Sequence, residues 1–488
     1  MTSFTLPLHS EPQRVYPMRR ARLVRLELRH STMVWFLALL GALFYFDAFR
    51  EAAGYPPIWF VRSSVILNHL VPDFSPFAAG VAAWTGSREG RRKMVELTTI
   101  AARPRWATAL ASFAATSIWT LAAFLGCVAA LYGFTATQTS WGGPPWWPVA
   151  AGAAVLCAIC ALGFAAGVLL PGRFTAPLAA LVTFLVLIVG FRVVLNESHP
   201  TFALLSPMNS VPHGDAGAFF HYFPDLYIVQ IIFFAGVGIA ALAGLGLATA
   251  SRSRIVWRTA AVVTAIGIGA AGAGVGLAGT ARVEANGVVV PAVHDAASDR
   301  LIAYTPVCQQ GAIPVCVHPA FRAYLPDLVA ALNPLIHQFA GLPGAPVRVE
   351  QSSSSTVAEL SVALSATEIE TLVGASATIT GKPPVLQVAL TELPSQPEPP
   401  SSGALAIEQG AFVDAFVDAF IGPAGGITGD PAQAAIEAAL LDNADSLPSP
   451  AAGAANRFAA LAPNVKHAWL ATHLQDLRAG HIALAQIP

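Results

Sequence analysis

An imidazole and a carboxylate lie four positions apart in an otherwise apolar stretch near the N-terminus. They are His69 and Asp73, and the amide Asn68 precedes them. Residues four apart on an unbroken helix share one face, so the two side chains could pair. Ionisable groups inside a membrane are costly and mark functional sites. We therefore predict that Asn68, His69 and Asp73 belong to a polar translocation path.

Two prolines in this stretch allow a competing interpretation. Pro72 and Pro76 predict a broken helix whose freed carbonyl groups face a cavity. Alternatively, residues 58–73 form an exterior re-entrant or interfacial segment. In that arrangement His69 and Asp73 lie in water and take no part in a path.

A second polar group, residues 87–106, is rich in cations. Its charged side chains are Arg88, Glu89, Arg91, Arg92, Lys93, Glu96, Arg103 and Arg105. Met94, Val95 and Leu97 supply an apolar edge, and Pro104 ends the helix. The pattern predicts a short amphipathic helix at the cytoplasmic membrane surface.

Two cysteines near the C-terminal half form the third group. Cys308 and Cys316 are eight positions apart, whereas Cys127, Cys157 and Cys160 fall in apolar stretches. In an oxidising compartment the first two are expected to form a disulfide, which contributes about 2–3 kcal/mol by the chain-entropy estimate. The alternative is a pair of free thiols.

Common catalytic motifs are missing from the sequence. A nucleotide-binding loop requires Gly-x4-Gly-Lys-Ser/Thr, and the nearest approach, residues 374–383, has the wrong spacing and no hydroxyl after Lys382. After residue 281 there is no His-Glu-x-x-His zinc motif and no Gly-x-Ser-x-Gly elbow. His318 stands alone beside a cysteine and is interpreted as structural. We predict no enzyme activity, no metal site and no cofactor in this chain.

The composition excludes a purely soluble protein. Of 488 residues, 55% are hydrophobic and 11% are charged, whereas soluble domains are about 25% charged. Residues 106–172 form a run of 67 without a charged side chain, which is enough for two spans of about 20 residues. Seven spans are predicted, at residues 31–46, 59–84, two in 106–172, 174–191, 226–251 and 259–281. Gly272 and Gly276 predict close helix packing in the last span.

Basic residues alternate between the connections of these spans. They are frequent before residue 31 and in residues 87–106, and they recur at Arg173 and in residues 252–258. The positive-inside rule then predicts a cytoplasmic N-terminus and an exterior C-terminus in a multi-pass plasma-membrane protein. A removable signal peptide is the alternative for the first stretch, although a signal anchor fits its long leader better.

The composition changes after the last span. Residues 282–488 hold 8 basic and 18 acidic side chains, against 19 and 10 before them, and the net charge of −1 gives no field that would attract nucleic acid. The predicted plan is a cytoplasmic segment (1–30), a membrane domain (31–281), an exterior soluble α+β domain (282–393), a Pro/Ser linker (394–403) and an exterior helical part (404–488). Strands are predicted at 283–291, 301–305, 347–350, 357–364 and 385–390, and helices at 321–339, 404–421, 431–441 and 462–479.

The segment after the second span carries a resemblance. Its Arg88-Glu89 pair, the following Glu96-Leu97 and its place before the third span resemble the coupling helix of type-2 ATP-binding-cassette (ABC) exporter permeases. The chain looks like an actinobacterial permease with an added exterior domain. The resemblance implies that Arg88 to Leu97 docks on a separate ATPase subunit that binds ATP. It also implies a homo- or heterodimer with another permease in the lipid bilayer.

Two further interpretations compete with this one. The basic segment could only anchor the chain to anionic lipid headgroups, each cation contributing about 1 kcal/mol, although Glu89 and Glu96 do not favour that role. The whole chain could instead be a membrane-anchored receptor or envelope-interaction protein that transports nothing. In that case the exterior domain binds the partner.

Overall fold

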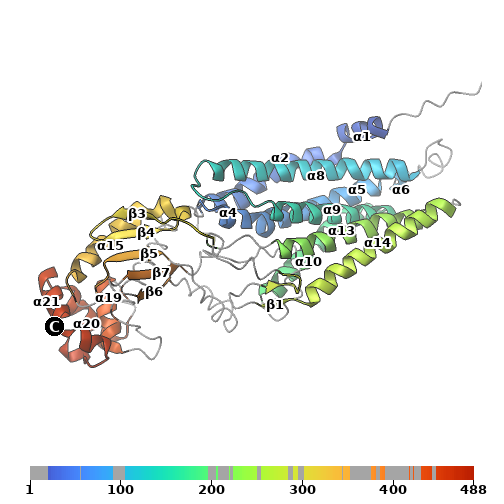
Figure 1. Ribbon diagram of the computed structural model, residues 1–488. Coiled ribbons are helices and arrows are strands. Elements are labelled where there is room, and N and C mark those ends of the chain that lie inside the picture. Colours follow the sequence, from blue (N-terminus) through green and yellow to red (C-terminus); the bar gives the residue numbers. More distant parts are fainter. Residues whose placement is uncertain are drawn as a thin grey trace, which may run out of the picture.

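The chain folds into a helical body followed by a smaller part that contains a β-sheet, as the computed structural model in Figure 1 shows. The structure describes residues 20–54, 57–91, 105–195, 205–206, 219, 224–249, 254–283, 289–294, 302–342, 345–351, 375–380, 385–390, 417, 421, 430–441, 444 and 447–488.

The helical body contains the elements that the charge-free runs predicted. Its elements are α1 (Arg20–Arg29), η1 (Thr32–Phe36), α2 (Leu37–Leu43), η2 (Phe44–Phe49), α3 (Arg50–Gly54), α4 (Trp59–Val65), η3 (Ile66–Leu70), α5 (Val71–Gly86), α6 (Arg88–Arg91), α8 (Arg105–Ala136), α9 (Trp147–Leu169), α10 (Thr175–Leu195), α13 (Asp225–Thr249) and α14 (Arg254–Gly279). Among the described residues, five helical stretches are long and apolar enough to cross a membrane: Val24–Gly54, Thr108–Ala136, Trp147–Leu169, Asp225–Ala248 and Arg254–Gly279. The length and composition of these helices confirm the prediction of a helical membrane protein.

Two predicted spans are not among these five stretches. Helix α10 runs from Thr175 to Leu195, and among its residues with described side chains the apolar stretch is Thr175–Val189, shorter than a typical span. The residues 59–84 expected to form span two contain two prolines, a histidine and two charges, and they are not among the five stretches. The count of seven spans and their direction stay predictions.

Pro72 and Pro76 do not break their helix, contrary to the expectation from the sequence. From Trp59 to Gly86 the backbone is helical without interruption through α4, η3 and α5, and α6 follows after Ser87. The π-helical turn η3 ends at Leu70, and Pro72 takes a place in the first turn of α5, where the hydrogen-bond pattern changes from π to α. We call residues 59–91 the linking helix.

The helical body packs through backbone contacts at glycines. A Cβ atom on Gly163 or Gly167 of α9 would collide with the carbonyl oxygen of Ala79 or Ala83 of α5. On α14 the close contacts are made by Gly267 and others. A Cβ atom on Gly272 or Gly276, which the sequence singled out, would meet nothing within 4 Å, because these glycines lie on a different face of α14. The sequence therefore identified the glycine-rich helix correctly, but it did not identify which face of that helix packs against its neighbour.

Three basic segments meet at one end of the helical body, which we call the basic end. Arg88 of α6 forms an ion pair with Glu27 of α1, their nitrogen and oxygen atoms 3.6 Å apart. Gly90 of α6 lies against Pro171 in the turn between α9 and α10, and Arg173 follows in that turn. In Figure 1, α1 and α6 lie at the end of the helical body away from the sheet.

The C-terminal part is built around a mixed sheet. It contains β1 (Arg282–Val283) and β2 (Val289–Val290), then β3 (Val307–Gln310), β4 (Pro314–Val317), β5 (Arg348–Gln351), β6 (Ala375–Thr380) and β7 (Val385–Leu390). The order in the five-stranded sheet is β3-β4-β5-β7-β6, with β4, β5 and β7 parallel to one another. Helix α15 (Leu325–Phe339) follows the turn η5 (Pro319–Tyr324), and the chain ends in α19 (Pro431–Leu440), α20 (Ser449–Ala459), α21 (Pro463–Arg478) and η8 (Leu484–Gln486).

The elements of this part agree with the sequence only in places. The strands at 347–350 and 385–390 and the helices at 431–441 and 462–479 are confirmed within one or two residues, while 321–339 divides into η5 and α15. The strand predicted at 301–305 is wrong, because the paired residues begin at Val307, where the partner strand β4 lies. Helix α20 was missed. The strand at 357–364, the linker 394–403 and most of the helix 404–421 lie outside the described residues.

The hydrophobic core of the C-terminal part is separate from that of the helical body and takes in side chains from both parts. Leu332 and Phe339 of α15 and Val315 of β4 are buried in it, together with Ile58 and Val61 from the start of the linking helix. Ser140, in the turn between α8 and α9, donates a hydrogen bond to the carbonyl oxygen of Pro319 at 2.7 Å. The end of the helical body opposite the basic end is therefore packed against the C-terminal part.

Candidate functional site

The imidazole of His69 lies between two carboxylates from the first apolar helix. Its Nδ1 is 2.9 Å from Oδ2 of Asp47, and its Nε2 is 3.1 Å from Oε2 of Glu51. The carboxylates come from η2 and α3, and His69 comes from η3. The side chains of His69 and Glu51 are 26% and 10% exposed, whereas that of Asp47 is 51% exposed, so the group is shielded at Glu51 and open at Asp47.

Hydrogen-bond counting determines the charge of this imidazole. A carboxylate can only accept a hydrogen bond, so each ring nitrogen that faces one must carry a proton. Both nitrogens of His69 face carboxylates. With Asp47 and Glu51 ionised, His69 is an imidazolium, and the three side chains sum to a net charge of −1. We call these three residues with Asp73 the carboxylate cluster.

Asp73 takes a different place from the one predicted. It lies one helical turn after His69, but the ring nitrogens of His69 are directed to Asp47 and Glu51. Its Oδ2 atom is buried without a hydrogen-bond partner among the described residues. Asn68 lies half-buried in the same π-helical turn as His69. The predicted path residues are thus neighbours, and an acceptor that could bind a cation or donor is directed into the protein.

Asp47 and Glu51 were missed as partners of His69. The signal was present, because they too are four positions apart in an apolar stretch. Nothing local connects that stretch to residue 69, and only helix packing brings the two together. Among the described residues no group of three or more side chains has the geometry of a metal site.

The described part of the predicted coupling segment is α6. Arg88, Glu89 and Arg91 lie on it, and Arg92, Lys93 and Glu96 lie outside the described residues. The guanidinium of Arg91 stacks on the ring of Trp84 at 3.3 Å and donates a hydrogen bond to the Trp84 carbonyl oxygen at 2.9 Å. These contacts attach α6 to the end of α5, while Glu89 remains exposed.

The linking helix joins this basic segment to the carboxylate cluster. Fifteen residues separate Asp73 from Arg88, or about 22 Å at 1.5 Å per residue. Helix α5 between them contacts α9 through Gly163 and Gly167 without room for a side chain. The first turn of the linking helix, at Ile58 and Val61, packs into the core of the C-terminal part. One continuous element therefore touches the basic end, the carboxylate cluster and the C-terminal part.

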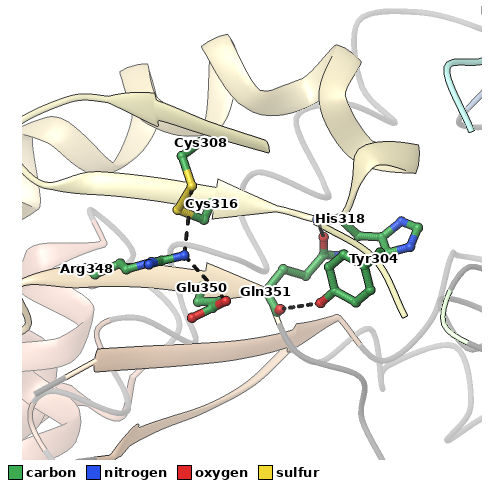
Figure 2. The surroundings of a disulfide bond; sticks show 7 residues. All are labelled: Tyr304, Cys308, Cys316, His318, Arg348, Glu350 and Gln351. Atoms are coloured by element: carbon green, nitrogen blue, oxygen red, sulfur yellow. Dashed lines mark hydrogen bonds and ion pairs between the residues drawn. A yellow bond between two sulfur atoms is a disulfide. The ribbon is translucent and has the colours of Figure 1, made fainter. Parts of the chain in front are cut away.

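The predicted disulfide is present between Cys308 and Cys316. The two cysteines are opposite each other in the antiparallel pair β3 and β4, with Cα atoms 4.0 Å apart. Arg348 on β5 lies between the disulfide and Glu350, with Nη2 3.9 Å from the Cys308 sulfur and 3.5 Å from Oε1 of Glu350 (Figure 2). The bond therefore joins the hairpin at the edge of the sheet.

His318 lies in an aromatic box at the junction of the two parts. The rings of Trp141, Phe219 and Tyr304 have centroids 4.9, 4.9 and 4.3 Å from the imidazole centroid. Its Nδ1 accepts a hydrogen bond from the Ala320 amide at 3.1 Å, which leaves the proton on Nε2. Figure 2 shows the imidazole beside the Tyr304 ring. Burial without a charged partner lowers the pKa of His318 to about 4.

The comparisons with known proteins add no family to this geometry. A scan against protein-family models, a search of curated proteins and a search of solved structures each return no match. The functional assignment therefore rests on the chain's own residues.

Proposed function

We propose that this chain is a multi-pass permease subunit of an ABC-type exporter in the plasma membrane, with its basic end in the cytoplasm and its C-terminal part outside. A separate ATPase subunit supplies ATP hydrolysis, and a second permease, identical or related, completes the transporter. The spans number seven in this proposal. The chain itself moves the substrate and carries out no covalent chemistry.

The linking helix is the observation that carries this proposal. A coupling device must connect a docking segment at the membrane surface to groups that contact substrate inside the membrane. The helix from Trp59 to Arg91 has exposed charges of α6 at one end and the carboxylate cluster about 22 Å along it. Because α5 and α9 touch backbone to backbone, a displacement of α6 would move both helices together.

The carboxylate cluster supports transport rather than simple anchoring. Ionisable residues inside a membrane persist where they face a cavity or one another. Two carboxylates share one imidazole here, and a buried oxygen of the neighbouring Asp73 has no hydrogen-bond partner among the described residues. A membrane anchor has no use for an uncompensated acceptor, whereas a path for a cationic or hydroxyl-bearing substrate does.

Co-purification from native membranes tests the proposal. An affinity-tagged chain is expected to retain an ATPase subunit, recognised by mass spectrometry through its Gly-x4-Gly-Lys-Ser/Thr loop. Glu89→Lys reverses an exposed charge on α6 and should reduce the retained ATPase at least tenfold. Arg258→Glu on α14 is the matched control, since it reverses an exposed charge outside α6 and should leave retention unchanged.

The same experiment separates the two functions. Absence of any ATPase from the purified complex, with Glu89→Lys indistinguishable from wild type, would contradict the permease. The receptor interpretation would then be preferred, with the C-terminal part as its binding module. His69→Ala tests the path independently: the ATPase should remain bound while its stimulation by the chain in nanodiscs falls.

A further inference from the structure

A polar pocket opens at the basic end. Its volume is about 310 Å³, and it lies where α1, the turn after it, the end of α5, α6 and α8 meet. Arg88 and Arg91 line it from one side and His30 from another, and Glu27 is the one acidic residue among the residues that line it. With His30 neutral, the charged side chains sum to +1.

Contacts with neighbouring residues hold the cations of this pocket in place. Arg88 pairs with Glu27 at 3.6 Å, and the Arg88 side chain is 46% exposed, so this ion pair contributes little. Arg91 lies on the Trp84 ring and donates to the Trp84 carbonyl oxygen. His30 donates from Nδ1 to the carbonyl oxygen of Leu26 at 3.0 Å. An anion entering the pocket would therefore meet the half-exposed guanidinium of Arg88, which its long contact with Glu27 neutralises only weakly.

An apolar groove continues from the same pocket. It has a volume of about 500 Å³ and runs between α5 and α10, past η1. Thr32 and Trp84 line both cavities, so the two are adjacent. The groove follows α5 from Trp84 back to Pro76 and α10 from Ala176 to Phe184, a length of about 12 Å at 1.5 Å per residue.

We propose that this composite cavity binds one anionic glycerophospholipid, with its phosphate in the polar pocket and an acyl chain in the groove. Two arginines beside a tryptophan are suited to a phosphate at the membrane interface. The groove is lined almost entirely by apolar side chains, which a free phosphate would not use. Continuity of the two cavities through Thr32 and Trp84 therefore favours an amphiphile.

The site is independent of the proposed transport function. It predicts a lipid bound to this chain whether or not an ATPase docks on α6. Bound lipid would join α1, α6 and α10 at the basic end.

Native mass spectrometry of the detergent-solubilised chain tests the site. Added dioleoyl phosphatidylglycerol is expected to form a 1:1 complex with at least fivefold more occupancy than dioleoyl phosphatidylcholine at equal concentration. Glycerol 3-phosphate, which carries a phosphate without acyl chains, should not compete at tenfold excess. Equal binding of the two lipids, or full competition by glycerol 3-phosphate, would overturn the proposal, the second result by pointing to a plain phosphate site.

Matched variants locate the lipid on the structure. Arg88→Gln with Arg91→Gln should weaken phosphatidylglycerol binding roughly tenfold to thirtyfold, as expected for two interfacial cations. Arg254→Gln with Arg258→Gln removes two exposed cations from α14, outside the pocket, and should change binding less than twofold. Similar losses for both pairs would mean diffuse surface charge and would contradict a defined site.

A groove variant remains informative if the double-arginine variant does not fold. Leu181→Trp places a larger ring in the groove, where Leu181 is 53% exposed, whereas Leu185 on the same helix is 49% exposed and does not line it. We expect at least a fivefold loss of lipid for Leu181→Trp and none for Leu185→Trp. Unchanged lipid binding in Leu181→Trp would show that the acyl chain does not lie in the groove.

Discussion

The helical body and the C-terminal part are held together by opposite means. In the body, α5 and α9 meet at Gly163 and Gly167, where no side chain separates the backbones. In the C-terminal part, large buried side chains such as Leu332 and Phe339 fill the space between α15 and the sheet. One part depends on the absence of side chains at its contacts, and the other depends on their size.

The difference follows from the solvent that each part meets. Between helices in lipid there is no hydrophobic driving force, so close van der Waals contact across small residues stabilises them. In water, burial of apolar surface contributes about 25 cal/mol per Å². Opposite substitution classes should therefore destabilise the two parts: small-to-large changes in the body and large-to-small changes in the C-terminal part. Four predictions follow the comparison.

The largest effect is expected for a small-to-large change in the body. Gly167→Leu places a side chain against the Ala83 carbonyl oxygen of α5 and forces the helices apart, with a loss of about 3 kcal/mol or more. Gly126→Leu on α8 is the control, because a Cβ at Gly126 has no neighbour within 4 Å. Thermal unfolding in detergent should separate the two variants, and equal melting temperatures would refute glycine packing.

A large-to-small change should do comparable harm in the C-terminal part. Leu332 is fully buried, so Leu332→Ala leaves a cavity and costs about 3 kcal/mol. Val347→Ala is the control, since Val347 is 45% exposed and should change stability by less than about 0.5 kcal/mol. Limited proteolysis of the C-terminal part measures the loss. If both variants resist protease equally, that part is not stabilised by its side-chain core.

The disulfide stabilises the C-terminal part covalently. The described residues of the helical body contain no disulfide. Replacing Cys308 and Cys316 by serine should lower the stability of the C-terminal part by about 2–3 kcal/mol, because the unfolded chain regains freedom. Reducing agent should produce the same shift in the wild type and none in the variant. Alkylation of both thiols without prior reduction would show instead that the bond is not formed in the native protein.

The smallest effect, over a single pH unit, concerns protonation at the junction between the two parts. The folded-state pKa of His318, about 4, lies below its ordinary 6.5, so the unfolded chain takes up the proton first. Stability is fully present above pH 6.5 and falls as pH decreases from 6.5 toward 4, by at most about 1.4 kcal/mol per pH unit for one proton. His318→Phe should abolish this slope when the melting temperature is measured against pH. An unchanged slope would show that a group other than His318 takes up the proton.

His69 and His318 show what local sequence can predict and what it cannot. His69 and Asp73 were expected to pair because they are four positions apart, yet His69 is held by Asp47 and Glu51, at least eighteen positions away in sequence. His318 was expected to be structural, and it is fully buried among rings from three separate segments. Spacing rules describe one helix at a time, so they identify a polar residue but not its partner in another element.

The membrane class, the position of the long apolar helices and the disulfide could be derived from the sequence, because hydropathy is a sum over consecutive residues and only two cysteines lie outside the apolar stretches. The tertiary structure decided the rest. It made the linking helix continuous through Pro72 and Pro76, selected the packed glycines, and brought the pocket and groove together at Thr32 and Trp84. These features depend on contacts between elements far apart in the chain, and the free energy of such contacts is set by their mutual packing.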